Sequence, residues 1–322
     1  MSAIGWVKSQ FSTLPYPDED CTGRAVIITG ANSGLGLEAA RHFVRLNAAK
    51  VILACRSIER GEAAKQEIES STPRHGVLEV WQLDLGSFDS VKEFAARAAK
   101  LDRLDVLLNN ASMLVSEWAM LEGHETMMTV NVISTMLLTV LLLPTLRRTG
   151  TRFNVTPHVS IVSSDAAFLA FFPERKADHV LNRLKENKNY PERYNTTKLL
   201  QLIMMHKLAE ASDASGKGHV IVNALNPGLC RTQLFRRWSF PLSWILWFLF
   251  AVLGREAEMG SRTLMAAALA GEETHGRWMS DCALQIWPKL MEGEQGERLA
   301  DKVWGELAEV LEGIEPGVMQ NV

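Results

Sequence analysis

A short apolar run that ends in a glycine-rich turn constrains the fold of this chain more than any other feature. Residues 24–29 (Arg-Ala-Val-Ile-Ile-Thr) predict a buried parallel strand, because helices cover both faces of such a strand. The turn at 30–36 (Gly-Ala-Asn-Ser-Gly-Leu-Gly) follows at once, and residues 34–47 have the pattern of a helix. A strand, a glycine-rich turn and a helix in this order form the unit that binds dinucleotides in doubly wound α/β folds.

The glycines of this turn each have a physical reason. Gly30 permits the tight turn, while Gly34 and Gly36 let backbone approach a phosphate and let the helix approach the sheet. The start of the helix offers free N–H groups and the positive end of its dipole to a pyrophosphate. The residues predicted to hold the phosphates are Gly30, Asn32, Ser33, Gly34, Leu35 and Gly36.

Strands and helices alternate along the rest of the chain, which predicts a parallel sheet wound on both faces. The expected strands are 24–29, 50–54, 77–83, 104–109, 158–163, 219–225 and 283–287. The expected helices are 34–47, 58–70, 87–100, 123–147, 192–212 and 255–270. A chain of 322 residues, 47% of them hydrophobic, can bury the core of one such domain.

Tyr194 and Lys198 stand four residues apart within an expected helix, so their side chains share one face. At an effective dielectric constant of about 20, a cation at about 4 Å stabilises a phenolate by roughly 4 kcal/mol. That energy lowers a pKa by about three units, which brings a phenol from about 10 towards neutrality. A tyrosine tuned in this way can exchange protons at physiological pH. Taken alone, the same spacing also fits an aromatic residue and a lysine on the surface.

Six elements resemble the motifs of the short-chain dehydrogenase/reductase family, in the family's order. They are the turn from Thr29 to Gly36, Asn109-Asn110-Ala111, Asn131, Ser164, Tyr194 with Lys198, and Asn226-Pro227-Gly228 with Thr232. Residues 9–11, 15–17 and 34–42 are similar to fungal members, which often serve secondary-metabolite pathways. The resemblance implies a single doubly wound Rossmann-type α/β domain, with a seven-stranded parallel sheet in the order 3-2-1-4-5-6-7.

The resemblance also implies interconversion of a carbonyl and an alcohol. Ser164 would hold the carbonyl oxygen and Tyr194 would donate the proton, while Lys198 would lower the tyrosine pKa and bind the nicotinamide ribose. Asn131 would connect Lys198 to solvent through a water. Ser163 competes with Ser164, because successive side chains on a strand face opposite sides, and the family uses the second serine.

The end of the second strand decides between two cofactors. An NAD enzyme usually has an acid there, whereas this chain has Arg56 and no carboxylate before Glu59. An arginine fork binds phosphate through two charge-assisted hydrogen bonds, so we expect NADP(H); a solvated charge is the alternative. By resemblance, the other cofactor contacts are Asp84, Leu85, Asn110, Ala111, Tyr194, Lys198, Pro227, Gly228, Leu229 and Thr232. Asp84 or Ser87 could instead cap the next helix.

Three segments lie outside the common pattern of this fold. Residues 1–22 form an N-terminal extension before the single domain at 23–322. Residues 166–191 contain three phenylalanines and form either a substrate lid or a surface excursion. The apolar segment 233–254 either covers the substrate or touches a membrane surface through residues 238–254.

The sequence therefore predicts an NADP(H)-dependent oxidoreductase that acts on an apolar carbonyl or alcohol in the cytoplasm, with peripheral membrane contact left open. The 34 basic and 37 acidic residues give no electrostatic case for nucleic acid. Four scattered cysteines indicate reduced thiols and no metal site. The resemblance implies a homo-oligomer through the helices near 123–147 and 192–212. Two rival functions are a cofactor-binding protein that guides a non-redox step and a non-enzymatic binding module.

Overall fold

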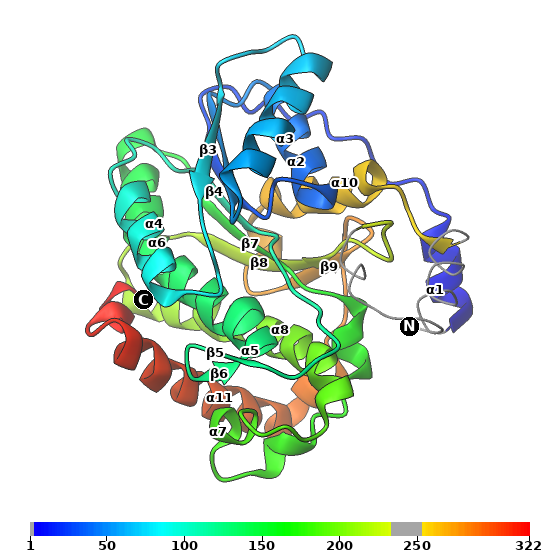
Figure 1. Cartoon of the computed structure of the whole chain (residues 1–322), viewed down its shortest axis with the longest axis vertical. Coiled ribbons are helices and arrows are strands. Elements are labelled where there is room, and N and C mark those ends of the chain that lie inside the picture. Colours follow the sequence, from blue (N-terminus) through cyan, green and yellow to red (C-terminus); the bar gives the residue numbers. More distant parts are fainter. Residues whose placement is uncertain (1–2, 233–252) are drawn as a thin grey trace.

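One eight-stranded sheet forms the centre of the molecule (Figure 1). The computed structural model describes residues 3–232 and 253–322. In their order across the sheet, the strands are β10 (Ala283–Leu284), β9 (Trp278–Ser280), β8 (Ile221–Asn226), β7 (His158–Val162), β4 (Val106–Asn109), β1 (Ala25–Thr29), β2 (Lys50–Cys55) and β3 (Leu78–Gln82). Neighbours from β9 to β3 pair in parallel, and β10 pairs antiparallel with β9. A separate ribbon joins β5 (Met120–Leu121) and β6 (His124–Glu125).

The predicted seven-stranded parallel sheet, with the order 3-2-1-4-5-6-7, was wrong at one edge, although the core of the sheet agrees with it. The parallel strand there is Trp278–Ser280, and the predicted strand 283–287 corresponds to the short antiparallel β10. The chain reverses between them because Asp281 and Cys282 both have positive φ, at 53° and 60°. Two such residues make the tight turn of a hairpin, but this pair lacks the usual asparagine–glycine signal.

Helices cover both faces of the sheet, which gives three layers (Figure 1). One face carries α2 (Gly34–Arg45), α3 (Ile58–Ser71) and α10 (Ala257–Ala268), and the other carries α4 (Phe88–Ala98), α6 (Ser134–Phe153) and α8 (Arg193–Ser215). Successive side chains of β1 point to opposite faces of the sheet. Val26 and Ile28 pack on the face that carries α2, α3 and α10, and Ile27 packs on the face that carries α4, α6 and α8.

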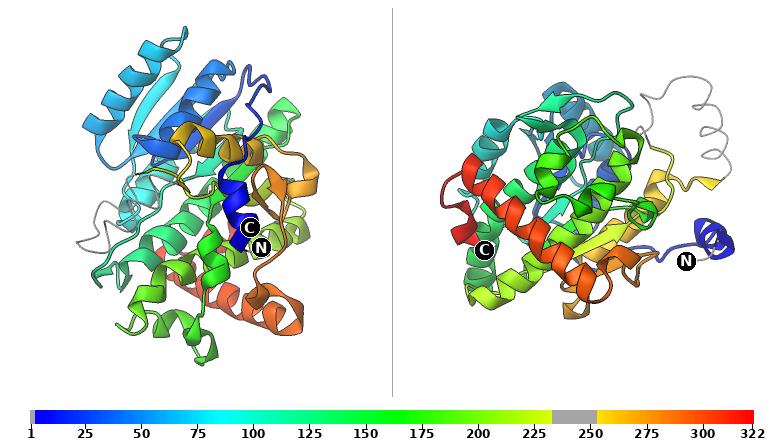
Figure 2. Two further views of the ribbon diagram at one scale, coloured as in Figure 1. Left: turned by 90° about the vertical axis from the view of Figure 1, so that its right-hand side faces the viewer. Right: turned by 90° about the horizontal axis from the view of Figure 1, so that it is seen from below.

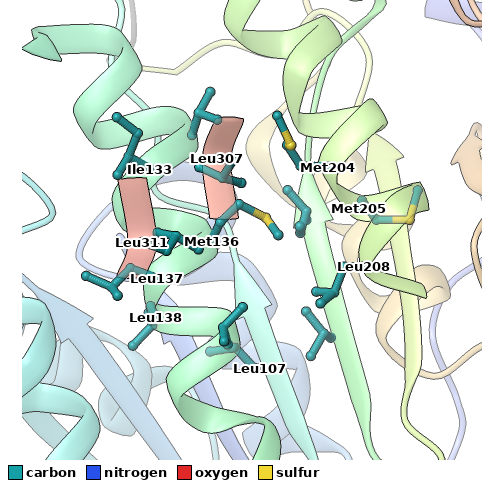
Figure 3. Packing of buried hydrophobic residues seen from close by; sticks show 14 of the residues in the cluster. Leu107, Ile133, Met136, Leu137, Leu138, Met204, Met205, Leu208, Leu307 and Leu311 are labelled. Atoms are coloured by element: carbon teal, nitrogen blue, oxygen red, sulfur yellow. The ribbon is translucent and has the colours of Figure 1, made fainter. Parts of the chain in front are cut away.

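A helix that the sequence analysis did not predict, α11 (Gly293–Ile314), lies outside α6 and α8 (Figure 2). Its Leu307 and Leu311 pack beside Met136 of α6 and Met204 of α8 (Figure 3). Helix α8 packs against β8 on one side and against α11 on another, so apolar residues are buried on more than one side of this helix.

Helix α6 and the helical turns before it form a segment that resembles a membrane-spanning helix in length and apolar composition. The stretch Thr126–Phe153 is apolar and long enough to cross a membrane, but 94% of its most apolar window is buried inside the protein. This is the position of a core helix in an α/β domain of the soluble type. The predicted helix 123–147 is also interrupted, since α5 (Thr126–Met128) passes into a π-helical turn, η1 (Thr129–Ile133), before α6 begins.

The remaining helical pieces are short. They are α1 (Ala3–Gln10), η2 (Asp165–Leu169), η3 (Pro173–Lys176), α7 (Val180–Arg183), η4 (Tyr190–Glu192), η6 (Glu272–Thr274), η7 (Lys289–Met291) and η8 (Val318–Asn321). The insert 166–191 thus folds into helical turns, and α7 is held by Glu306 of α11, which accepts the N–H groups of Val180 and Leu181. Most of the apolar segment 233–254 lies outside the described residues, so its role stays a prediction.

Candidate active site

A cavity of about 820 Å³ lies at the carboxyl ends of the parallel strands, where open α/β sheets bind their ligands. All of the predicted catalytic and cofactor residues line it except Gly36 and Asn131. Those two pack directly against lining residues, Gly36 against Asn110 and Asn131 against Met113. The structure therefore brings into one place residues that are up to about 200 positions apart in the chain.

The glycine-rich turn makes the close approaches that its glycines permit. Gly30 has a φ of +67°, in the left-handed region that favours glycine. At Gly36 an added Cβ would come within 2.6 Å of Asn110 Nδ2 and 2.8 Å of the Gly30 carbonyl oxygen. Ser33 precedes α2 without bonding its N–H groups through the side chain. The start of α2 is thus suited to an anionic ligand such as a pyrophosphate.

Gly36→Ala is expected to disturb this turn, because neither Asn110 nor the Gly30 carbonyl has room for a methyl group. We expect a loss of about 1–3 kcal/mol, the usual cost of overpacking, and about tenfold or greater weakening of NADPH binding. Thermal melting and NADPH fluorescence titration measure the two effects. The control is Gly305→Ala in α11, where an added Cβ meets nothing within 4 Å. Equal behaviour of the two variants would contradict the role of Gly36.

The end of β4 is tied to the end of β1. Thr29 Oγ1 accepts the backbone N–H groups of Asn110 and Ala111 at 3.0 and 2.9 Å, and Asn110 Nδ2 donates to the Thr29 carbonyl at 2.8 Å. Asn109 points elsewhere, and its Nδ2 donates to Thr139 Oγ1 of α6 at 3.0 Å. Asn110 and Ala111 therefore form a fixed wall of the cavity beside the glycine-rich turn.

Two arginines line the cavity close to the carboxyl end of β2. Arg56 is exposed at the end of β2, and Arg60, in the first turn of α3, lines the cavity with it. Within residues 3–232 and 253–322, neither guanidinium has a hydrogen bond or ion pair to protein. The sequence analysis did not single out Arg60, although a second arginine at the start of the helix that follows Arg56 is the signal that could have found it.

Asp84 and Ser87 have separate roles. Ser87 caps α4 by accepting the N–H of Ser90, so Asp84 is not the cap. Asp84 Oδ1 instead accepts the Gly86 N–H at 2.9 Å, and Asp84 and Leu85 line the cavity. This leaves the Asp84 carboxylate at the edge of the predicted adenine site.

Ser164, Tyr194 and Lys198 meet on one wall of the cavity. The Tyr194 side chain is hydrogen-bonded to Ser164, and Lys198 Nζ lies 5.6 Å from the centre of the Tyr194 ring. Ser163 Oγ donates to the Lys198 carbonyl oxygen at 2.9 Å, so its hydroxyl is used by the backbone. Only the second serine of the pair thus contacts the tyrosine hydroxyl.

Burial sets the proton affinities of the tyrosine and the lysine. Burial raises the pKa of Tyr194, and the hydrogen bond to Ser164 offsets part of that rise. Burial lowers the pKa of Lys198 to about 7. The expected lowering of the Tyr194 pKa by Lys198 is therefore absent in this structure, because a lysine with this pKa carries only part of its charge at neutral pH.

Asn131 is buried behind this wall and ties three segments together. Its Oδ1 accepts the Met113 N–H at 2.7 Å, and its Nδ2 donates to the Met113 carbonyl at 2.9 Å and to Thr197 Oγ1 at 3.2 Å. Lys198 reaches Asn131 through Gln201: Lys198 Nζ donates to Gln201 Oε1 at 3.0 Å, and Gln201 Nε2 donates to the Asn131 carbonyl at 2.7 Å. Gln201 thus bridges Lys198 and Asn131, and the link from Lys198 to solvent through a water stays a prediction.

The N-terminal extension contributes to the site, which the sequence analysis did not foresee. Gln10 of α1 accepts the Leu229 N–H at 3.0 Å, and Arg255 Nη1 donates to the Pro227 carbonyl at 3.3 Å. Arg255 also pairs with Asp281 at 2.7 Å. These contacts fix the loop 227–229, the predicted nicotinamide contact, from its outer side.

Trp6 of α1 lines the cavity and donates from Nε1 to Asp165 Oδ2 at 3.1 Å. Burial raises the pKa of Asp165, while its hydrogen bonds to Trp6 and Asn226 lower it. Asp165 directly follows Ser164, so α1 reaches the neighbourhood of the reacting groups. Leu169 and Pro191, from the two ends of the insert, also line the cavity. The tryptophan-rich part of the segment 233–254 lies outside the described residues.

Comparison with known proteins agrees with this arrangement. Residues 24–169 match the short chain dehydrogenase family. The short chain dehydrogenase/reductase dmxR8 of Cryptosporiopsis sp. is 39% identical over 99% of this chain and 100% of its own length. This chain belongs to the short-chain dehydrogenase/reductase family. The short chain dehydrogenase atnD of Emericella nidulans is 45% identical over 87% of this chain and 90% of its own length.

Solved members of the family have the same fold. A short-chain dehydrogenase from Sphingobium yanoikuyae, determined in complex with NADPH, superposes with a TM-score of 0.58 at 21% identity. The match covers 93% of this chain and 96% of that protein. Like other short-chain dehydrogenases/reductases, this chain is an oxidoreductase of a family that uses nicotinamide cofactors.

Proposed function

We propose that this short-chain dehydrogenase/reductase uses NADP(H) to interconvert a carbonyl and an alcohol on an apolar small molecule. The observation that carries the proposal is the meeting of Ser164, Tyr194 and Lys198 on one cavity wall, with Tyr194 bonded to Ser164. A proton donor and a polar group for the carbonyl oxygen are what carbonyl reduction requires of the protein.

The cavity suits the whole cofactor, and its adenosine end favours the phosphorylated form. The start of α2 and the glycine-rich turn would hold the pyrophosphate. Arg56 and Arg60 would bind the 2′-phosphate, since both line the cavity without a protein partner in the described ranges. Asp84, Asn110 and Ala111 would contact the adenosine half, and Pro227, Gly228, Leu229 and Thr232 the nicotinamide half. The NADPH complex of the Sphingobium protein supports the same choice by analogy.

Three side chains would have separate roles in the reduction. The nicotinamide supplies the hydride when it is bound. Ser164 donates a hydrogen bond to the carbonyl oxygen, and Tyr194 gives its hydroxyl proton to that oxygen as the carbon accepts the hydride. The raised pKa of Tyr194 keeps the hydroxyl protonated at neutral pH, which is the form that reduction needs. A charged Lys198 would stabilise the tyrosinate that remains and would bind the nicotinamide ribose.

The substrate side of the cavity favours an apolar molecule. Trp6, Met113, Leu114 and Leu169 line it. The fungal relatives, together with this apolar lining, support a role in the synthesis of a secondary metabolite. We propose a cytoplasmic location for the enzyme, since the one helix of residues 3–232 and 253–322 that is apolar and long enough to cross a membrane is buried in the core.

The deciding experiment measures NADPH consumption by the purified protein with a panel of apolar aldehydes and ketones. We expect NADPH to be oxidised by at least one of them, with an equal amount of alcohol formed, and NADH to be used more slowly. NADPH binding without oxidation by any carbonyl would contradict the redox function and favour a non-redox reaction. Failure to bind either nucleotide would leave the fold as a binding module.

The rate of reduction should depend on pH through Lys198. The lysine pKa is about 7, so the ammonium is present below that pH and is lost above it. Tyr194 stays protonated throughout, because its pKa is raised. We therefore expect kcat/KM for NADPH, which reports the free enzyme, to fall as the pH rises through about 7, when it is measured with saturating carbonyl substrate from about pH 5.5 to about pH 9. A kcat/KM for NADPH that rises through neutrality would contradict this assignment.

A further inference from the structure

Gln201 makes two hydrogen bonds that the proposed reaction does not yet use. It lies three residues after Lys198 on α8, and only 2% of the residue is exposed. Its Oε1 accepts from Lys198 Nζ at 3.0 Å, and its Nε2 donates to the Asn131 carbonyl at 2.7 Å. Both ends of the carboxamide are therefore engaged, and each end bonds a residue of the predicted catalytic set.

The π-helical turn η1 presents the Asn131 carbonyl to Gln201. Asn131 is the central residue of this turn, Thr129–Ile133, where the wider coil changes the regular hydrogen bonding of the helix backbone. The carbonyl is completely buried, and a buried carbonyl without a partner costs free energy. The Gln201 amide is the side-chain group that satisfies it, so the π turn and Gln201 form one unit.

Neutral groups surround the Lys198 ammonium. Besides Gln201, it donates to the Val162 carbonyl at 2.9 Å, at the end of β7. The Lys198 ammonium also faces the ring of Tyr194, which belongs to the same helix. The Asn131 carbonyl of η1 is connected to it only through Gln201. Among the residues that the structure describes, no charged side chain perturbs the pKa of Lys198, which burial alone lowers to about 7. Lys198 thus keeps its place by hydrogen bonds to neutral acceptors.

We propose that Gln201 is a positioning residue, which joins Lys198 to Asn131 and determines how firmly the lysine ammonium is held beside Tyr194. The carboxamide fixes Nζ in space without adding a charge. The lysine pKa therefore stays near neutrality, where the ammonium that would stabilise the tyrosinate is partly formed. This inference rests on the proposed function for its meaning in catalysis, but the contacts of Gln201 are independent of any substrate.

The first test changes the charge at this position and keeps its length. Gln201→Glu places a carboxylate against Lys198 Nζ, which favours the charged lysine and should shift the midpoint of the pH profile of kcat/KM for NADPH upward by about one unit or more. A role limited to packing would change kcat/KM for NADPH without moving the midpoint. The control is Gln66→Glu on the exposed side of α3, which should leave the profile in place. An unmoved midpoint in Gln201→Glu would overturn the proposal.

The second test separates hydrogen bonding from volume. Gln201→Ala opens room for a water that can bridge Lys198 and Asn131, whereas Gln201→Met fills the space with a side chain that cannot donate a hydrogen bond. We expect the smaller residue to be the better replacement, with a kcat about tenfold above that of Gln201→Met. Equal rates, or a faster methionine variant, would contradict the bridging role. Thermal melting shows that each variant is folded.

A calorimetric measurement tests the inference without turnover. NADPH is titrated into each protein at pH 7 in two buffers that differ in ionisation enthalpy, which yields the number of protons taken up on binding. If cofactor binding favours the charged lysine, the wild-type protein should take up about half a proton, because its lysine is about half charged at that pH. Gln201→Glu should take up much less, since its lysine is already charged. Equal uptake by the two proteins would overturn the proposal even if a carbonyl substrate is found, and a clear difference would support it even if none is found.

Discussion

Replacing Tyr194 by phenylalanine is expected to lower kcat for carbonyl reduction by about 10²–10⁴-fold, the usual contribution of a positioned acid. The change removes only the hydroxyl, which is bonded to Ser164 and faces the cavity. The ring stays beside Lys198, and the residues predicted to contact the phosphates and the adenosine are other residues of the cavity lining. NADPH binding should therefore remain within about threefold of the wild-type value. Steady-state kinetics and fluorescence titration measure the two quantities.

The matched control for this change is Tyr16→Phe. Tyr16 is exposed and packs edge-on against His42, with Arg45 over its ring, so its hydroxyl has no part in the cavity. This variant should keep the wild-type kcat. If Tyr194→Phe also keeps the wild-type kcat, another group delivers the proton. If NADPH binding is lost together with turnover, the hydroxyl serves the cofactor and not the reaction.

The second large effect is expected at the adenosine end of the cavity. Changing Arg56 and Arg60 together to aspartate removes two cations and adds two anions where the 2′-phosphate is expected. A hydrogen bond to a charged group contributes about 1.5–3 kcal/mol, so loss of both should lower kcat/KM for NADPH by about 10²–10⁴-fold. NADH lacks the 2′-phosphate and should lose little. The preference for NADPH over NADH should therefore fall by a similar factor, or reverse.

The single variants show how the two arginines share this work. Arg56→Asp and Arg60→Asp should each have part of the effect, and Arg277→Asp is the control for added negative charge. Arg277 is exposed directly before β9, near the opposite edge of the sheet from β3. If the double variant keeps the nucleotide preference of the wild type, the 2′-phosphate is bound elsewhere, for example by Asn32 or Ser33 of the glycine-rich turn.

Local patterns predicted the parts of the site that depend on short-range geometry. The turn at 30–36 follows a strand and opens a helix, and that order fixes its position at the carboxyl edge of the sheet. The four-residue spacing of Tyr194 and Lys198 holds because both lie in the first turns of α8. The direction of the tyrosine pKa did not follow from spacing. Burial acts on both residues at once, and it weakens the cation that was expected to act on the phenol.

The parts that the sequence analysis missed depend on long-range contacts. Trp6 is 159 positions from its partner Asp165, and Gln201 is 70 positions from Asn131. No periodicity in the chain connects such residues. The π turn that presents the Asn131 carbonyl is also invisible in composition, since the residues around it fit an ordinary helix. The helix α11 is different, because Ala300, Val303, Leu307 and Leu311 have clear helical spacing and could have been found.

The position of α11 has a consequence for assembly. The family resemblance implied that the helices near 123–147 and 192–212 would meet their counterparts in a second copy. In this chain α11 covers α6 and α8, the helices that would form the interface, and its Leu307 and Leu311 pack against them. The outward side of α11 presents charged residues, among them Glu297, Arg298 and Asp301. A neighbouring molecule that approached from this side would thus meet a hydrated, charged exterior before it reached α6 or α8.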